Sequence, residues 1–239
     1  MGSEVEKKVP SIVTGLREVD EKLGGGIPVG SLGLIEGHSD AGKSVLCQHL
    51  AYGALQVSDL SVAYYTTENT VKSLVSQMDS LNLCTLDHFL MDRMRIYPLS
   101  LRGDDDDTQS RFQALLKHFD KLPGYFKLVI VDSITLLVAH SDQVANVDFF
   151  SACKNLCDQG RTIILVAHSY AFDEEVLSRT RSLCDAHFRI RLETMGDRLV
   201  KILEVLKVRG AERATGDVVT FEVEPKVGMR VIPMSKAKV

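Results

Sequence analysis

The sequence predicts an α/β fold with a mostly parallel central sheet flanked by helices, followed by antiparallel hairpins towards the carboxyl-terminal end. Short apolar segments alternate with helical patterns through the first two thirds of the chain. Two of these segments, KLVIVD and TIILVA, are almost entirely apolar, which is typical of strands buried on both faces of a parallel sheet. The last third alternates apolar and polar residues around turns. Because no linker rich in Pro, Gly or Ser interrupts residues 1–239, we expect a single domain.

The predicted parallel strands are short, and most are followed by a helical pattern. Strands are expected at residues 31–36, 62–67, 94–99, 127–132 and 162–167. Helices are expected at residues 43–56, 70–83, 108–119 and 147–159. Asn69 or Thr70 can cap the second helix, and Gly160 ends the fourth. This β-α-β-α order places helices on both faces of the sheet.

Two stretches of the last third have the pattern of antiparallel hairpins. Residues 186–193 and 197–208 flank a turn at 195–197, and residues 218–225 and 229–233 flank a turn at 226–228. An acidic run, RGDDDDTQ at 102–109, precedes the third helix. We expect it to form a solvated loop, with metal chelation as the alternative.

Composition limits the classes of function. The chain has 45% apolar and 25% charged residues, a net charge of −4 and a pI near 6.0. These values argue against a nucleic-acid binder that uses a large basic face, although local basic clusters are compatible with them. The sequence lacks an apolar stretch of the roughly 18 to 20 residues that a membrane span needs, and its start, MGSEVEKKVP, is charged. We therefore expect a soluble, cytoplasmic protein.

The five cysteines do not form the pattern of a disulfide framework. They are an odd number without paired C-x-x-C motifs, and we expect reduced thiols packed as small hydrophobic groups. Cys153 and Cys157 are four residues apart and can share a helix face. Two ligands alone do not make a metal site.

A phosphate-binding loop lies between the first strand and the first helix. Its sequence, GHSDAGKS at 37–44, fits G-x-x-x-x-G-K-[ST]. The glycines let the backbone N–H groups and the helix N-terminus face phosphates, Lys43 can reach the β- and γ-phosphates, and Ser44 can ligate Mg²⁺. The expected nucleotide-binding residues of the loop are Gly37, His38, Ser39, Asp40, Ala41, Gly42, Lys43 and Ser44.

Two loop positions are less typical than the rest. His38 occupies an unspecific position, where a surface imidazole is expected. Asp40 is unusual because phosphates repel a carboxylate, and we expect it to point towards solvent or a neighbouring subunit.

Two carboxylates follow predicted strands that end beside this loop. Asp132 ends LVIVD and is expected to be exposed at the carboxyl end of its strand, where it holds Mg²⁺ directly or through water. Capping of the following turn is the alternative. Ser133, and not a carboxylate, comes next. Glu68, in TTENT, can polarise an attacking water, or it can be a helix-start Glu favoured by the helix dipole.

Together these motifs resemble the RecA/KaiC family of P-loop proteins. The resemblance rests on the loop, on Glu68, on Asp132 with Ser133, on KVRGA at 207–211, and on the lead-in TGLREVDEKLGGGIPVGSL at 14–32. It runs from about Val13 to Ile232. Within the family, GKSVLCQHLAYGAL followed by TTENTVKSLVSQMDSL is most similar to the accessory ATP-binding proteins of the archaeal flagellum (archaellum) motor.

The resemblance implies a RecA-like core that binds ATP with Mg²⁺ and forms a homo-oligomeric ring, usually a hexamer, with nucleotide between neighbours. It also implies that Lys207 and Arg209 reach the neighbour's nucleotide and stabilise charge on its γ-phosphate. Two solvated surface cations are the alternative. Ala211 and Arg213 are implied to lie near the base or ribose. The implied partners are the motor ATPase FlaI and membrane platform proteins, with the protein peripherally associated with the membrane-embedded motor.

One departure from the family bears on catalysis. KaiC-like enzymes typically have paired Glu residues after the second strand, whereas here Asn69 follows Glu68. We therefore expect tight ATP binding with slow or negligible hydrolysis. After the strand at 162–167, His168 and Ser169 are candidate sensors of the γ-phosphate that couple to residues 173–182, for which a surface helix of mixed charge is the competing interpretation.

Three functions follow from these observations. The first is a regulatory or assembly subunit of the archaellum motor, in which the nucleotide state controls ring formation and docking. The second is an active KaiC-like ATPase or autokinase, in which Glu68 is competent. The third, a RecA-like DNA-strand protein, is disfavoured by the net charge of −4 and by the lack of basic loops interleaved with aromatic residues.

Overall fold

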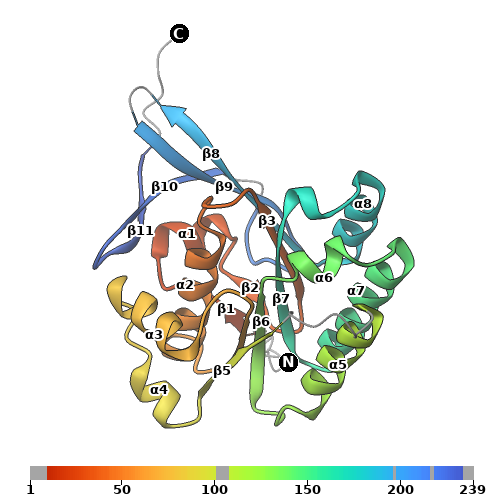
Figure 1. The fold of residues 1–239 in the computed structure, drawn as a ribbon. Helices are drawn as coiled ribbons and strands as arrows, with labels where there is room; N and C mark the ends of the chain where they lie inside the picture. The colour runs from red at the N-terminus through yellow and green to blue at the C-terminus, as the bar shows by residue number, and fades with distance from the viewer. Residues whose placement is uncertain (1–9, 101–107, 196–197, 216–217, 234–239) are drawn as a thin grey trace, which may run out of the picture.

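A mixed sheet forms the centre of the molecule, as Figure 1 shows. The computed structural model describes residues 10–100, 108–195, 198–215 and 218–233. Within these residues the sheet has nine strands in the order β11-β10-β9-β8-β3-β7-β6-β4-β5. A separate two-stranded sheet pairs β1 (Ser11–Ile12) with β2 (Ile27–Pro28).

The strands from β8 to β5 in this order are parallel. They are β3 (Leu32–Gly37), β4 (Ser61–Thr66), β5 (Met94–Pro98), β6 (Phe126–Asp132), β7 (Thr162–His168) and β8 (Ala186–Met195). Antiparallel strands then extend the sheet from β8. They are β9 (Arg198–Val208), β10 (Val218–Glu224) and β11 (Gly228–Val231). The predicted α/β fold with a mostly parallel sheet and terminal antiparallel hairpins is confirmed.

Helices cover both faces of the sheet (Figure 1). One side has α1 (Arg17–Lys22), α2 (Lys43–Gln56), α3 (Val71–Ser80) and α4 (Leu86–Leu90). The other has α5 (Thr108–Lys121), α6 (Thr135–Ala139), α7 (Gln143–Asp158), the 3-10 turn η1 (Ser169–Ala171) and α8 (Glu174–Leu183). Neighbouring residues of β3 enter different cores, since Ile35 packs on the α2 side and Leu34 on the α7 side. This alternation explains why the strand reads as a continuous apolar run.

The predicted elements form with shifted ends. Helix 43–56 has the expected limits, whereas helix 147–159 begins earlier, at Gln143, because the Asp142 side chain accepts a hydrogen bond from the Ala145 N–H at 2.7 Å. Thr70, and not Asn69, caps α3 in a capping box with Ser73. That helix ends at Ser80, before the predicted limit. Of the acidic run, residues 102–107 lie outside the described residues, and α5 starts at Thr108.

The β10–β11 hairpin closes over the helix that follows the phosphate loop. The Met229 N–H donates a hydrogen bond to Nε2 of His49, at 3.0 Å, and His49 is buried in α2. Gly228 is required at this contact, since a Cβ there would lie 2.4 Å from the same nitrogen. The carboxyl-terminal hairpin is therefore attached to α2.

The cysteines follow the prediction except at one position. Cys47, Cys153, Cys157 and Cys184 are buried and free, as expected of thiols packed as small hydrophobic groups. Cys84 is also free, but it is exposed, so the prediction is wrong there. It lies between α3 and α4, and its neighbours Leu83 and Thr85 are buried.

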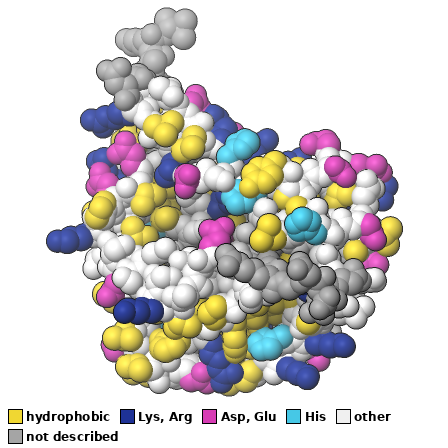
Figure 2. All heavy atoms as spheres, viewed as in Figure 1, with side chains coloured by type: hydrophobic (Ala, Val, Ile, Leu, Met, Phe, Trp, Pro, Cys, Tyr) yellow, Lys and Arg dark blue, Asp and Glu magenta, His cyan; other side chains and the backbone are white. Residues whose placement is uncertain are grey.

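The surface carries mixed charge on the face drawn in Figure 2. Among the described residues in view, Lys and Arg side chains are scattered between acidic and apolar ones and form no broad basic area. No helix in the described part of the chain is long and apolar enough to cross a membrane.

Candidate nucleotide-binding site

The phosphate loop leaves β3 at Gly37 and enters α2 at Lys43. Glycine is needed at its start because a Cβ on Gly37 would lie 2.1 Å from the backbone oxygen of Ile190 in β8. Gly42 has φ 100° and occupies the N-cap of α2, a backbone conformation that a side chain disfavours. Asp40 has φ 58° and is exposed, as are His38 and Ser39, while Ala41 is buried. The expected surface position of His38 is confirmed.

Lys43 lies across the loop that precedes it. Its ammonium donates hydrogen bonds to the carbonyl oxygens of Gly37, at 3.1 Å, and His38, at 2.6 Å. Burial lowers the pKa of Lys43, and the nearby carboxylates of Asp132 and Glu68 oppose this effect. The lysine is thus buried, curled into the loop and positioned beside the space that the loop encloses.

That space is a cavity of about 450 Å³. From the loop and the start of α2 it is lined by Ser39, Asp40, Gly42, Lys43 and Ser44. The carboxyl ends of the neighbouring strands add Glu68, Asp132 and His168. The fold therefore brings together residues that the sequence separates by more than a hundred positions, at the edge where parallel strands of α/β proteins bind ligands.

Asp132 is buried, with 7% of its surface exposed, which contradicts the expectation of an exposed carboxylate. The reason is Tyr64 of the adjacent strand β4, whose hydroxyl donates a hydrogen bond to Oδ2 at 2.9 Å. Burial raises the pKa of Asp132, and hydrogen bonds from Ser44 and Tyr64 oppose this rise. The alternative role as a cap receives no support, because the N–H groups of Ser133 and Ile134 donate to Thr67 and Val166.

The donor set fits Mg²⁺ when phosphates complete it. Ser44 and Asp132 place a hydroxyl and a carboxylate side by side in the cavity. In the described residues no group of three or more His, Cys, Asp and Glu side chains forms a metal site by itself. Mg²⁺ commonly binds through one or two protein oxygens together with water and nucleotide phosphates, which matches this arrangement.

Glu68 and Asn69 have different surroundings. Glu68 is exposed and lines the cavity, and within the described residues no hydrogen bond orients its carboxylate. The amide oxygen of Asn69 accepts hydrogen bonds from Ser73 Oγ, at 3.1 Å, and Gln77 Nε2, at 3.0 Å. Asn69 is therefore occupied on α3, and Glu68 is the residue of the two that faces the cavity.

His168 connects the loop with the far side of the cavity. Its Nε2 lies 3.3 Å from Ser39 Oγ, and its Nδ1 lies 3.1 Å from Thr135 Oγ1 in α6. The ring also stacks on Tyr170. Burial and the Lys43 charge lower the pKa of His168. Ser169 begins η1, and residues 174–183 form α8, the surface helix of mixed charge considered for this segment.

Two residues that line the cavity were not predicted from the sequence. Lys201 of β9 and Val223 of β10 line it, and Lys201 Nζ donates a hydrogen bond to the Asp40 carbonyl at 2.7 Å. The Lys201 side chain also packs on Gly42, where an added Cβ would lie 3.1 Å from its Cδ. The alternation in β9 indicates which residues share a face with Lys201, but not that the antiparallel strands curl over the loop.

Lys207 and Arg209 lie outside this cavity. Lys207 pairs with His187 at the start of β8, whereas Gly37 pairs with Ile190 further along the same strand. At about 3.3 Å per residue, the two positions are roughly 10 Å apart along the sheet. The Lys207 ammonium donates to the Arg181 carbonyl at 2.6 Å, and Arg209, with 57% of its side chain exposed, donates to the Ser182 carbonyl at 3.3 Å.

The segment with Ala211 and Arg213 also lies away from the cavity. The N–H groups of Glu212 and Arg213 donate to the Gly24 carbonyl. In its own subunit this segment therefore packs on the lead-in to β2, and the expected contact with a base or ribose is not formed there.

A comparison with known proteins agrees with this architecture. The family model described as "ATPase: KaiC" matches residues 12–236. The chain is 35% identical over 216 residues to the archaeal flagellar ATP-binding protein FlaH of Methanocaldococcus jannaschii, covering 90% of this chain and 91% of the relative. The chain belongs to the KaiC family, among its FlaH proteins.

Further FlaH proteins support the assignment of this KaiC-family chain. The FlaH protein of Sulfolobus acidocaldarius is 30% identical over 229 residues, which cover 95% of this chain and 99% of the relative. The crystal structure of the flagellar accessory protein FlaH from Methanocaldococcus jannaschii has a TM-score of 0.82, with 95% and 100% of the two chains covered. The resemblance inferred from the sequence motifs is confirmed.

Proposed function

We propose that this KaiC-family chain is an ATP-binding regulatory or assembly subunit of the archaellum motor. Its nucleotide state controls the formation of a ring and docking to the motor ATPase FlaI and to membrane platform proteins. The protein is then cytoplasmic and peripherally associated with the membrane-embedded motor. The two FlaH relatives, which are named for ATP binding in the archaeal flagellum, support this proposal.

The observation that carries the proposal is the cavity around the phosphate loop. Lys43, Ser44 and Asp132 converge there, so that a cation, a hydroxyl and a carboxylate face one space. In our proposal Lys43 exchanges the carbonyls of Gly37 and His38 for phosphate oxygens. Ser44 and Asp132 hold the Mg²⁺ of the nucleotide, Asp132 directly or through water, and the metal there neutralises phosphate charge.

Weak or absent hydrolysis is supported by the surroundings of Glu68. A general base must be held within reach of the water it activates. Glu68 is exposed, and no hydrogen bond among the described residues orients it, while Asn69 is engaged by Ser73 and Gln77. Such a site holds ATP for long periods, which suits a subunit that signals by occupancy.

The proposal includes a contribution of two cations from one subunit to the nucleotide site of its neighbour. Lys207 and Arg209 lie at the start of β8, whereas the loop of their own subunit meets the same strand further along, at Ile190. Arg209 is more than half exposed, which leaves its guanidinium available to a neighbouring copy. In a ring these cations stabilise charge on the neighbour's γ-phosphate.

The alternative is an active KaiC-like ATPase or autokinase. It is favoured by one observation, that Glu68 lines the cavity together with Lys43 and Asp132. Turnover measured at saturating Mg-ATP separates the two functions. A rate of about 1 per second or more that Glu68→Gln abolishes would establish an active ATPase and exclude the regulatory function.

The test of the regulatory function is a pull-down with FlaI and with platform proteins. Wild type, Lys43→Ala and the control Lys72→Ala, an exposed lysine of α3, are compared with ATP, ADP and no nucleotide. We expect partner capture to change with the nucleotide for wild type and Lys72→Ala, and to lose this dependence in Lys43→Ala. If capture is the same for all variants and nucleotides, nucleotide-controlled docking is wrong.

A further inference from the structure

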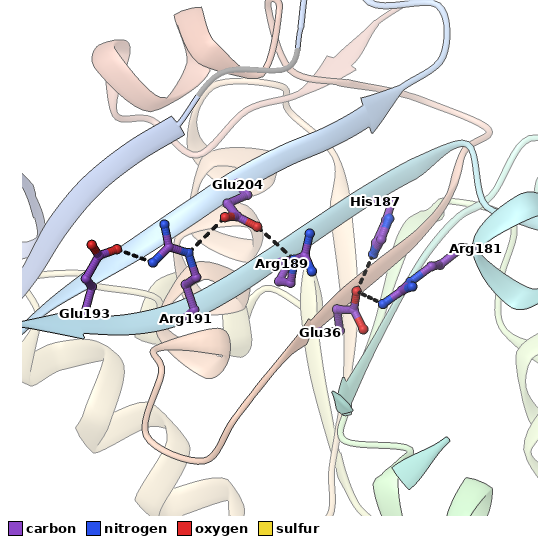
Figure 3. Close-up of polar contacts among 7 residues, drawn as sticks. All are labelled: Glu36, Arg181, His187, Arg189, Arg191, Glu193 and Glu204. Carbon is purple, nitrogen blue, oxygen red and sulfur yellow. Dashed lines mark hydrogen bonds and ion pairs between the residues drawn. The ribbon is translucent and has the colours of Figure 1, made fainter. Parts of the chain in front are cut away.

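A buried charged cluster joins the strand that precedes the phosphate loop to helix α8. Glu36 is the residue immediately before Gly37 and is completely buried. Figure 3 shows Arg181 and His187 converging on its carboxylate. Arg181 donates to Oε1 at 2.7 Å, and His187 Nε2 lies 2.8 Å from the same oxygen.

The cluster keeps Glu36 ionised. Burial alone would raise the pKa of this carboxyl group, but the hydrogen bonds from His187 and Arg181 lower it. The second oxygen, Oε2, has no hydrogen-bond partner within the described residues, and neither does Nε of Arg181. A buried charge held by one shared oxygen is costly, and a hydrophobic residue would avoid that cost. Stability alone therefore does not account for a carboxylate here.

The same arginine also supports the cations proposed to act in trans. The Arg181 carbonyl accepts the hydrogen bond from the Lys207 ammonium at 2.6 Å, and the next carbonyl, that of Ser182, accepts one from Arg209 at 3.3 Å. His187, the second partner of Glu36, is the cross-strand neighbour of Lys207. Both groups that hold Glu36 are thus in direct contact with the strand end that carries Lys207.

We propose that Glu36 is a positioning residue that links the phosphate loop of its own subunit, through Arg181, to Lys207. The chain of contacts is short. Glu36 is covalently joined to the loop through Gly37 and accepts a hydrogen bond from Arg181 of α8, and the Lys207 ammonium donates to the Arg181 carbonyl. A nucleotide that draws Gly37 and Lys43 towards its phosphates shifts the residue that holds Arg181. The presentation of Lys207 to the neighbouring subunit then depends on the subunit's own nucleotide.

A similar cluster on the same strands supplies a matched control. Glu204 of β9 accepts hydrogen bonds from Arg189, at 2.8 Å, and Arg191, at 2.9 Å, and Figure 3 shows this group beside the first. In both groups one carboxylate is held by two basic side chains. Unlike Glu36, Glu204 does not precede the phosphate loop, and its two partners come from β8 and not from α8, on which Lys207 rests.

The inference rests on the proposed function and is tested by the dependence of self-association on ATP. Sedimentation of wild type, Glu36→Gln, Glu204→Gln and Lys207→Met is measured with and without Mg-ATP, and ATP affinity is measured on the dilute monomer. We expect Glu36→Gln to reduce the ATP-induced gain in association about tenfold, within the usual range of coupling between sites. Monomer affinity for ATP should change by less than about threefold, and Glu204→Gln should behave like wild type.

A double variant separates positioning from a general structural effect. If Glu36 acts through Lys207, then Glu36→Gln combined with Lys207→Met associates no more weakly than Lys207→Met alone. Arg181→Met breaks the same link from α8, where 28% of the arginine side chain is exposed, and it should reproduce Glu36→Gln even if the buried variant folds poorly.

Three outcomes overturn the inference. If Glu36→Gln and Arg181→Met both associate like wild type, or if the effects of Glu36→Gln and Lys207→Met simply add, Glu36 does not act through Lys207 and the proposed function stands. If wild type does not respond to ATP and Lys207→Met changes nothing, the proposed ring and the positioning role both fail.

Discussion

Acidification should weaken the attachment of the carboxyl-terminal hairpin to α2 through His49. Burial lowers the pKa of this imidazole from 6.5 to about 4, and its hydrogen bond with the Thr14 backbone opposes the shift. The Met229 N–H already donates to Nε2, so a proton cannot be added there without breaking that contact.

The sign and size of the effect follow from proton binding. The unfolded chain takes up a proton near pH 6.5, whereas the native imidazole does so only near 4. Between these values the unfolded state binds more protons, so the stabilisation is complete above about pH 6.5 and is lost as the pH falls towards 4. The pKa of His49 differs by about 2.5 between the unfolded and the native state. At about 1.36 kcal/mol per pKa unit, the free energy of unfolding falls by about 3 kcal/mol.

Urea unfolding followed by circular dichroism at several pH values measures this loss. Other groups titrate in the same window, so the quantity compared is the difference between wild type and His49→Gln. Glutamine keeps an uncharged acceptor for the Met229 N–H, and His140→Gln, at an exposed position, is the control. On acidification, the free energy of unfolding of His49→Gln should fall by about 3 kcal/mol less than that of wild type. Parallel curves for wild type and His49→Gln would refute this account.

Three further substitutions test the cavity. Lys201→Met keeps an apolar stem beside Gly42 but removes the ammonium, so affinity for ATP should fall roughly 10- to 100-fold while affinity for uncharged adenosine is unchanged in the same titration. An equal loss of affinity for ATP and for adenosine would indicate a collapsed cavity instead. Tyr64→Phe removes the hydroxyl that holds Asp132 and should weaken Mg²⁺ dependence of nucleotide binding roughly tenfold, read by magnesium titration. Glu68→Gln removes a negative charge from the cavity, so ATP affinity should hold or rise in equilibrium binding, and a clear loss would contradict its placement.

Local patterns predicted the order of the elements and the central part of the site. The phosphate loop, Glu68 and Asp132 each follow a strand whose apolar run is visible in the sequence, and parallel strands bring such ends to one edge. Short elements were harder to predict. Helix α4, for example, has only five residues and none of them is buried, which leaves little periodicity to detect.

Contacts between distant residues were not predictable from the sequence. Tyr64 meets Asp132 across 68 positions, and the pairing of β4 with β6 that makes this possible depends on strand order. Lys201 reaches Asp40 across 161 positions, and Arg181 reaches Glu36 across 145. Lys201 and Arg181 are each a single charged residue in a segment that the sequence pattern alone assigns to the surface. Only the curl of the antiparallel strands and the placement of α8 turn these side chains inward.

The position of β8 in the sheet affects how many subunits form one complete ATP site. It is parallel to β3 on one side and antiparallel to β9 on the other, so the sheet reverses direction there. The phosphate loop meets β8 at Ile190, midway along the strand, whereas Lys207 and Arg209 lie at the start of the strand, roughly 10 Å away. If these cations complete a neighbour's site, copies associate head to tail, and the binding unit is a pair of subunits. The apparent affinity for ATP then rises with protein concentration, and a single isolated chain has only part of a site.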